Sequence, residues 1–297
     1  MRYFYFGLLF VFCIFFSVSC SQKKEIKEIT VFYAPCFSPI MDIVQKDTEQ
    51  DLGINLRTEV SGSQVVLRKI TELGRECDVV MIADNTLFEK IGKNYFKWRI
   101  DFVHDEVVLG VGARASRVDE AETDWVNALL DSNISLGRVD ENLGPIGYRT
   151  LMVWKLKERE GFDGLTEKLK GKTEKVLDDV ENLAVMLKSG DIDYGFLYKS
   201  TCIKNDIRFI PLDEKINLGS EGYDYSSVNV DFKTVEQGVE KNVSVKGDLI
   251  TYSLSVPENA LHKDEAMKFI RYLISDRKSD FEKHGIKVLK ENRKILL

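Results

Sequence analysis

Apolar segments of strand length alternate with helix starts along most of the chain. Strand-like segments, apolar throughout or alternating apolar with polar side chains, cover residues 29–33, 55–60, 78–82, 107–111 and 194–198. Helices are predicted to begin at Ser38-Pro39, at Ser63, at Pro145 and at Asp178-Asp179. An extended segment over 249–256 and a final amphipathic helix over 266–273 follow. This alternation predicts an α/β architecture, with no structure predicted for residues 213–246.

Local signals also predict how the first two helices begin, pack and end. Ser38 is expected to cap the N-terminus of the first helix with its side chain. The second helix is expected to bury Val66, Ile70 and Leu73 and to stop at Gly74.

The N-terminal segment predicts export and lipid attachment. Arg2 is the only charged residue before Cys20, and residues 3–18 form an apolar run that is too short and too early for a membrane span. The small residues directly before Cys20 are typical of a lipoprotein processing box. We therefore expect a signal peptide over 1–19, acylation of Cys20, a polar tether over 20–28, and a membrane-anchored protein that is periplasmic or at the cell surface. An uncleaved anchor or an ordinary secretion signal is the alternative.

Charge and cysteine content argue against several classes of protein. The formal net charge of −6 leaves no basic surface suited to nucleic acid. Cys36, Cys77 and Cys202 are an odd number at wide spacings, which argues against a disulfide scaffold and against a zinc site. We expect these three thiols to be reduced, with a Cys36–Cys202 bridge as the alternative, and we expect no metal and no cofactor.

Short loops of small residues lead into helix starts at four places. These loops lie at residues 34–38, 61–63, 143–147 and 178–181. A helix N-terminus offers unpaired N–H groups and the positive end of the helix dipole. Several such ends directed at one point would bind an anion without a basic side chain, although each loop alone is ordinary in an α/β protein.

Longer motifs resemble one family throughout the chain after residue 28. These are Gly62-Ser63-Gln64 with the following VVLRKITELGRECDVVM, the Pro145-x-Gly147-Tyr148-Arg149-Thr150-Leu151-Met152-Val153 stretch, SGDIDYGFLYKS (189–200) and VKGDLITYSLSVPENALHKDEAMKFIRYLIS (245–275). In order and spacing they resemble the molybdate/tungstate-binding proteins of ABC importers, in particular the tungstate-preferring branch.

The resemblance implies a type II periplasmic-binding-protein fold, with two α/β lobes joined by two crossing strands. Lobe 1 would comprise residues 29–105 plus 250–297 and lobe 2 residues 106–249, with crossings near 102–109 and 246–253. The implied function is that of an extracytoplasmic solute-binding lipoprotein of an ABC importer. Such a protein would be a monomer that captures a small oxyanion, delivers it to the importer permease, and catalyses no reaction.

The resemblance also assigns ligand contacts residue by residue. The oxyanion would be bound by side chains or backbone amides of Cys36, Ser38, Ser63, Ile146, Val180 and Tyr198. Two carboxylates of the tungstate branch are missing, because Gly144 and Leu197 stand at their expected positions. Without them the ion would be held by hydrogen bonds as a four-coordinate species. A changed ligand, such as another oxyanion or a small carboxylate, is the alternative.

Two other classes of function are weighed against this one. A surface lipoprotein with the same fold could bind a protein partner, but Ser63, Tyr198 and the proline loop favour a working anion pocket. A cysteine enzyme built on Cys36 would need a base, and none of the histidines has a suitable context. Arg149, in the first turn of its helix, is expected to brace the two lobes through a carboxylate rather than to bind the ligand.

Overall fold

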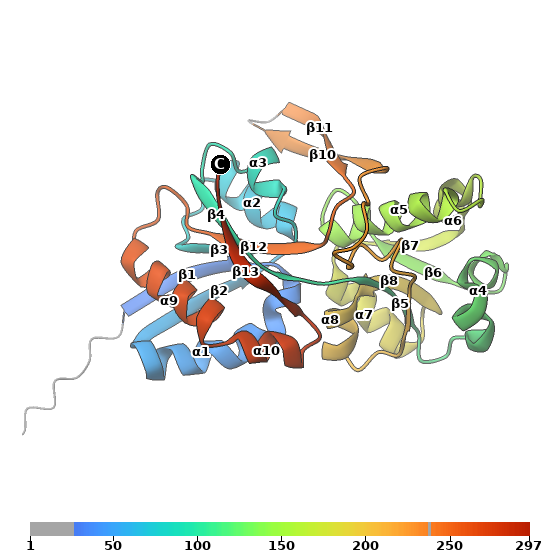
Figure 1. Ribbon diagram of the computed structural model, residues 1–297, viewed down its shortest axis with the longest axis horizontal. Coiled ribbons are helices and arrows are strands. Elements are labelled where there is room, and N and C mark those ends of the chain that lie inside the picture. The colour runs from blue at the N-terminus through green and yellow to red at the C-terminus, as the bar shows by residue number, and fades with distance from the viewer. Residues whose placement is uncertain (1–26, 237–238) are drawn as a thin grey trace, which may run out of the picture.

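The computed structural model describes residues 27–236 and 239–297, which fold into two lobes, each built on its own β-sheet (Figure 1). The predicted signal peptide, Cys20 and most of the tether lie outside the described residues. The first strand already begins at Lys27, so that the last two residues of the predicted tether belong to the folded lobe. In the described part of the chain, no helix is long and apolar enough to cross a membrane.

Lobe 1 is built on a six-stranded sheet with the strand order β13-β4-β12-β3-β1-β2. Its strands are β1 (Lys27–Tyr33), β2 (Ile54–Val60), β3 (Val79–Ile82), β4 (Trp98–His104), β12 (Thr251–Ser255) and β13 (Lys287–Leu296). Strands β1, β2 and β3 run parallel, whereas β12 and β13 pair antiparallel with β4. The sheet therefore joins the beginning of the chain to its end.

Helices cover both faces of this sheet. The lobe 1 helices are η1 (Pro35–Phe37, a 3-10 turn), α1 (Ser38–Leu52), α2 (Ser63–Thr71), α3 (Leu87–Lys90), α9 (Lys263–Ser275) and α10 (Lys278–Lys283). In Figure 1, α1, α9 and α10 lie below the sheet, and α2 and α3 lie above it. Two local predictions are wrong. Ser38 is the first residue of α1 and makes no side-chain cap, because η1 leads directly into the helix. Leu73 lies beyond the end of α2 and is 70% exposed.

Lobe 2 is built on a five-stranded sheet with the strand order β7-β6-β8-β5-β9. Its strands are β5 (Val107–Val111), β6 (Leu136–Val139), β7 (Thr173–Leu177), β8 (Tyr194–Tyr198) and β9 (Phe209–Pro211). Its helices are α4 (Val118–Leu130), α5 (Pro145–Glu158), α6 (Leu165–Lys172), α7 (Val180–Ser189) and α8 (Lys199–Lys204). Helix α5 is buried along most of its length, including the whole of its first turn. The first turn of α5 is therefore fixed inside the molecule, where lobe 2 meets lobe 1.

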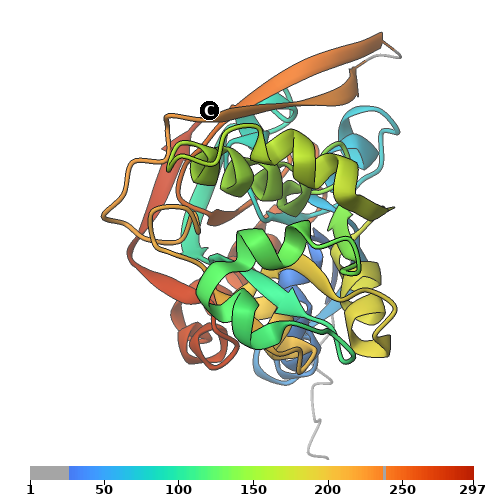
Figure 2. The ribbon, with the colours of Figure 1, turned by 90° about the vertical axis from the view of Figure 1, so that its right-hand side faces the viewer.

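A third, two-stranded sheet lies at the boundary of the lobes. It is the antiparallel hairpin of β10 (Asn229–Glu236) and β11 (Val239–Lys246), within the stretch for which the sequence predicted no structure. In Figures 1 and 2 the hairpin lies at the top of the molecule, and its strand β10 contacts both α5 of lobe 2 and α2 of lobe 1. The chain passes between the lobes from β4 to β5 and again from the hairpin to β12.

Candidate functional site

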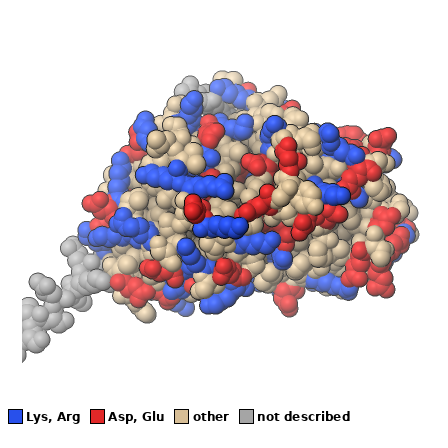
Figure 3. Space-filling model, viewed as in Figure 1, with Lys and Arg blue, Asp and Glu red and all other residues tan. Residues whose placement is uncertain are grey.

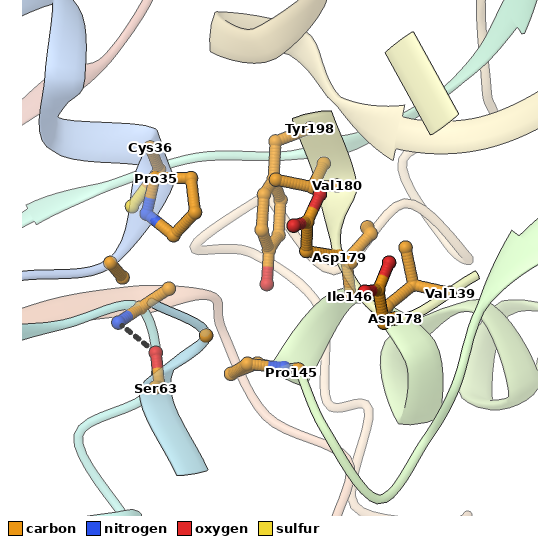
Figure 4. Close-up of a pocket in the computed structure, with 14 residues that line it drawn as sticks. Pro35, Cys36, Ser63, Val139, Pro145, Ile146, Asp178, Asp179, Val180 and Tyr198 are labelled. Atoms are coloured by element: carbon orange, nitrogen blue, oxygen red, sulfur yellow. Dashed lines mark hydrogen bonds between the residues drawn. The ribbon is translucent and has the colours of Figure 1, made fainter. Parts of the chain in front are cut away.

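A small pocket lies where the two lobes meet (Figure 4). Lobe 1 contributes the loop after β1, the start of α2 and the end of β3, and lobe 2 contributes β6, the starts of α5 and α7, and the end of β8. The lining residues are Ala34, Pro35, Cys36, Gly62, Ser63, Ala83, Val139, Gly144, Pro145, Ile146, Asp178, Asp179, Val180 and Tyr198. The cavity volume is about 30 Å³, which exceeds the space for one water and suits a small ion.

Helix starts from both lobes meet at this pocket. The residues Cys36 of η1, Ser63 of α2, Ile146 of α5 and Val180 of α7 all line it, and each stands in the first turn of its helix. N–H groups in a first turn have no partner within the helix, and the longer helices add the positive ends of their dipoles. The four predicted loops therefore do converge on one pocket.

Two hydroxyl groups add donors to these amides. Ser63 is fully buried, and its Oγ accepts a hydrogen bond of 3.0 Å from the backbone N–H of Ala83. The hydroxyl hydrogen of Ser63 is therefore free to be donated. The Tyr198 hydroxyl is buried without a hydrogen-bond partner and points into the space between the lobes (Figure 4). Burial raises the pKa of Tyr198 well above its usual value, so that the phenol stays a neutral donor.

Cys36 contributes a neutral thiol to the wall of the pocket. Burial, and next the charge of Asp105, raise the pKa of Cys36 well above that of a free thiol. A nucleophilic cysteine needs the thiolate form, which this environment disfavours. Cys77 and Cys202 are also buried, and none of the three cysteines forms a disulfide. Within residues 27–236 and 239–297, no cluster of His, Cys, Asp and Glu could hold a metal ion.

No lining residue carries a positive charge, and the two lining carboxylates have other partners. The Asp179 side chain caps α7 by accepting the N–H of Asn182 at 2.8 Å, and Asp178 accepts from the Asn182 side chain at 2.7 Å. Figure 3 shows acidic and basic side chains interspersed over one face of both lobes, so that the surface in view gives no general attraction to anions. Anion binding in this pocket would therefore depend on the directed N–H and O–H groups.

A buried ion pair joins the lobes beside the pocket. Asp84, which follows β3 in lobe 1, accepts hydrogen bonds from the Tyr148 hydroxyl at 2.6 Å and from Arg149 Nη2 at 2.8 Å, both in α5 of lobe 2. Both partners of the ion pair are almost fully buried. The prediction that Arg149 braces the lobes through a carboxylate is confirmed. A second contact across the boundary runs from the Gln64 side chain to the carbonyl of Glu141 at 3.0 Å.

Two residues that the resemblance assigned to the ligand region lie elsewhere. Ser38 is outside the pocket, and its side chain lies beside the Tyr33 hydroxyl, whose pKa it lowers against the larger raising effect of burial. Leu197 is fully buried in lobe 2, where its side chain lies 3.2 Å from the point that a Cβ on Gly110 would occupy. A carboxylate at position 197 would thus enter the lobe 2 core. Gly144, in contrast, does line the pocket.

Sequence reasoning missed the contribution of the end of β3. Ala83 lines the pocket and holds Ser63, and Asp84 anchors the other lobe. The sequence does contain a signal for this contribution. An aspartate, Asp84, follows the apolar strand β3 within two residues, at the end of the strand, where side chains reach the edge of a sheet. Gly62 was noted only as part of a motif, yet a Cβ there would lie 2.4 Å from the carbonyl oxygen of Leu143 in the opposite lobe.

Two α/β lobes with a pocket at their boundary are the architecture of periplasmic binding proteins, and the family of the chain gives its class. The chain belongs to the family described as bacterial extracellular solute-binding protein, whose model matches residues 29–287. This family comprises binding proteins rather than enzymes, and membership implies a small ligand and an ABC transporter as partner.

Relatives and solved structures agree with this assignment. An uncharacterized solute-binding protein of Petrotoga mobilis is 33% identical, with 92% of this chain and 86% of the relative covered. The molybdate/tungstate-binding protein WtpA of Pyrococcus abyssi is 27% identical, with 88% and 81% covered. The periplasmic molybdate-binding protein of Azotobacter vinelandii has a similar fold, with a TM-score of 0.63 at 15% identity, covering 89% of this chain and all of that one. The predicted type II periplasmic-binding-protein fold is confirmed.

Proposed function

We propose that this protein captures a small tetrahedral oxyanion of the molybdate/tungstate class and delivers it to an ABC importer. The observation that carries the proposal is the buried, unpartnered hydroxyl of Tyr198, which points into a pocket ringed by first-turn amides from both lobes. A donor left unsatisfied in a protein interior is costly, and an oxyanion would satisfy it together with Ser63 and the amides of Ile146 and Val180. WtpA of Pyrococcus abyssi, by its name, binds this class of ion.

The donors favour a four-coordinate ion held by hydrogen bonds alone. Gly144 brings no carboxylate to the pocket, and Asp178 and Asp179 are engaged at the start of α7. Cys36 supplies a weak donor where a hydroxyl would be stronger, so that its backbone N–H carries most of its contribution. Ser38, outside the pocket, has no direct contact in this proposal.

We further propose that ligand capture is a closure of two bodies, residues 29–105 plus 250–297 and residues 106–249. Its support is the pair of connections from β4 to β5 and from β11 to β12, which are the passages between the two large sheets. The protein would work as a monomer, held outside the cytoplasmic membrane by a lipid on Cys20. Mass spectrometry of the N-terminus of the purified protein, with Cys20→Ser as the soluble control, would test the anchor.

Thermal unfolding with different oxyanions tests the proposed ligand class. A ligand present at a hundredfold excess over its dissociation constant adds about 2.7 kcal/mol to the free energy of unfolding. We expect molybdate and tungstate to raise the melting temperature, and sulfate and phosphate to raise it less. If none of the four ions raised it, the oxyanion proposal would be wrong, although the family assignment would stand.

A further inference from the structure

A carboxylate is buried at the passage from β4 to β5, close to the pocket and without a cation. Asp105 is 2% exposed. Its Oδ2 accepts hydrogen bonds from Ser200 Oγ at 2.5 Å and from the Tyr252 hydroxyl at 2.8 Å, and its Oδ1 accepts from the backbone N–H of Glu106 at 2.8 Å. In the described residues no Lys, Arg or His forms an ion pair with it; the neighbouring Lys199 pairs with Glu106.

The hydrogen bonds of Asp105 lead directly to the wall of the pocket. Tyr252 Oη, which donates to Asp105, also lies beside the Cys36 thiol. Burial and the charge of Asp105 raise the pKa of Cys36, and the Tyr252 hydroxyl lowers it by less. The ring of Tyr252 packs edge-on against Tyr198, with 5.8 Å between the ring centroids. Cys36 and Tyr198 both line the pocket. Asp105 is therefore separated by one side chain, Tyr252, from two residues that line the pocket.

Every titratable side chain found to interact with Asp105 is neutral at neutral pH. Cys36 comes from η1, Tyr198 from β8, Cys202 from α8 and Tyr252 from β12, and burial raises the pKa of each of them. None of these four side chains thus offers an opposite charge to an ionised Asp105. In a poorly polarisable interior its field would act on an anion in the pocket.

We propose that Asp105 is a positioning residue that makes anion capture depend on protonation, with the protonated carboxyl favouring the bound state. This inference rests on the proposed oxyanion function. An ionised Asp105 repels the bound anion, whereas a protonated one does not and still bonds Ser200 and Tyr252. Binding of an anion must then raise the affinity of Asp105 for a proton by the same factor, because linkage is reciprocal.

The ionisation of Asp105 falls in a range that a cell envelope can reach. Burial raises the pKa of Asp105 to about 6, although the bonds from Ser200 and Tyr252 lower it. Without ligand the group is mostly ionised at pH 7.5 and mostly protonated at pH 5.5. Affinity for an oxyanion of constant charge should therefore rise as the pH falls through about 6. If the bound anion raises the pKa of Asp105 by about one unit, the gain is about tenfold.

Isothermal titration calorimetry with molybdate, tungstate and sulfate between pH 5.5 and 8.0, in buffers of different ionisation enthalpy, tests the proposal. We expect wild type to bind about sixfold more tightly at pH 5.5 than at pH 7.5, which is most of the full tenfold gain, with proton uptake near pH 6.5. Sulfate controls for protonation of the ligand itself. Asp105→Asn should bind tightly at every pH and take up no proton. Glu106→Gln, which changes the adjacent carboxylate that pairs with Lys199, should keep the wild-type pH profile.

A second variant separates charge from architecture. Tyr252→Phe removes a hydrogen bond that lowers the pKa of Asp105, so its pH midpoint should move upward while the dependence persists. If Asp105→Asn does not fold, the shift of the pH midpoint in Tyr252→Phe and the number of protons that wild type takes up on binding test the proposal instead. A pH-independent wild-type affinity without proton uptake overturns the role of Asp105 alone. Absence of binding of all three ions at any pH overturns the proposed function instead.

Discussion

At the residue scale, the buried hydroxyl of Tyr198 has no hydrogen-bond partner, whereas the nearby hydroxyls of Tyr148 and Tyr252 donate to Asp84 and Asp105. We predict that Tyr198→Phe weakens molybdate binding about ten- to a hundredfold, since hydrogen bonds to charged groups contribute about 1.5–3 kcal/mol. The free energy of unfolding without ligand should not fall, because no hydrogen bond within the protein is lost. Calorimetric titration and urea unfolding measure the two effects.

Tyr148→Phe is the matched control for Tyr198→Phe. The Tyr148 hydroxyl donates to Asp84 at 2.6 Å, so its removal should lower the free energy of unfolding by about 1–2 kcal/mol. An unchanged affinity in Tyr198→Phe would contradict the place given to this hydroxyl.

The absent side chain of Gly62 is also a feature of the site. A Cβ at this position would lie 2.4 Å from the Leu143 carbonyl oxygen across the lobe boundary. The backbone angles of Gly62, φ −53° and ψ 147°, are open to any residue, so that alanine is compatible with separated lobes. We predict that Gly62→Ala folds normally but cannot close, and weakens molybdate binding by about tenfold or more.

Small-angle X-ray scattering with saturating molybdate checks the effect of Gly62→Ala, because wild type should become more compact than the variant. Gly171→Ala serves as the control, since a Cβ there meets nothing within 4 Å. Equal compaction in Gly62→Ala and wild type would contradict the prediction, because it would show that the backbone at Leu143 can move away and let the lobes close.

At the element scale, the sequence predicted the parts whose apolar pattern is continuous. Strands β5 and β8 and the helix α7, with its Asp179 cap and its end at Gly190, lie where the pattern placed them. Strands β13 and β11 were missed because their side chains are mostly polar and exposed, so that pairing with other strands, rather than burial, defines them. Strand β10 was missed although it buries Val230, Phe232 and Thr234 in alternation with exposed residues.

The candidate site was predictable to a similar extent. The loops could be located because helix starts have recognisable residues, but their convergence depends on contacts distant in sequence. One error was avoidable from local geometry. Leu197 and Tyr198 are consecutive in β8, and consecutive strand residues point to opposite faces. They could not both face the ligand.

The hairpin offers a prediction at this scale. Arg68 of α2 donates to the Lys233 carbonyl at 2.7 Å, to Thr234 Oγ1 at 3.2 Å and to the Asn142 carbonyl of lobe 2 at 3.4 Å. Asn142 Oδ1 in turn accepts the Lys233 N–H at 2.6 Å. These bonds connect α2, the hairpin and lobe 2, and they can form together only when the lobes are closed.

We therefore predict that Arg68→Ala speeds molybdate dissociation roughly three- to tenfold, as the loss of about 1 kcal/mol implies. A stopped-flow chase measures this rate. Arg75→Ala removes an arginine that pairs with Glu59 inside lobe 1, and it should leave the rate unchanged. Equal rates in wild type and Arg68→Ala would mean that the hairpin belongs to lobe 2 alone.

At the scale of the whole molecule, the Asp84–Arg149 pair sets the balance between open and closed forms. The two charges are 2.8 Å apart and almost fully buried when the lobes meet, and separation of the lobes would return them to water. Truncating one partner leaves the other charge buried and unpaired in the closed form, at a cost of about 3–5 kcal/mol, whereas replacing both with apolar residues costs far less.

Closure should therefore respond to these changes in a definite order. We predict that Asp84→Leu and Arg149→Met each weaken molybdate binding at least a hundredfold, because each penalises the closed form alone, and that the double variant recovers most of the affinity. Calorimetric titration of the four proteins completes a double-mutant cycle. Additive losses would mean that the two residues act independently. Recovery in the double variant would show that the lobes can close without the ion pair, but not with one of its charges buried alone. Ligand recognition would then depend on the neutral donors around the pocket.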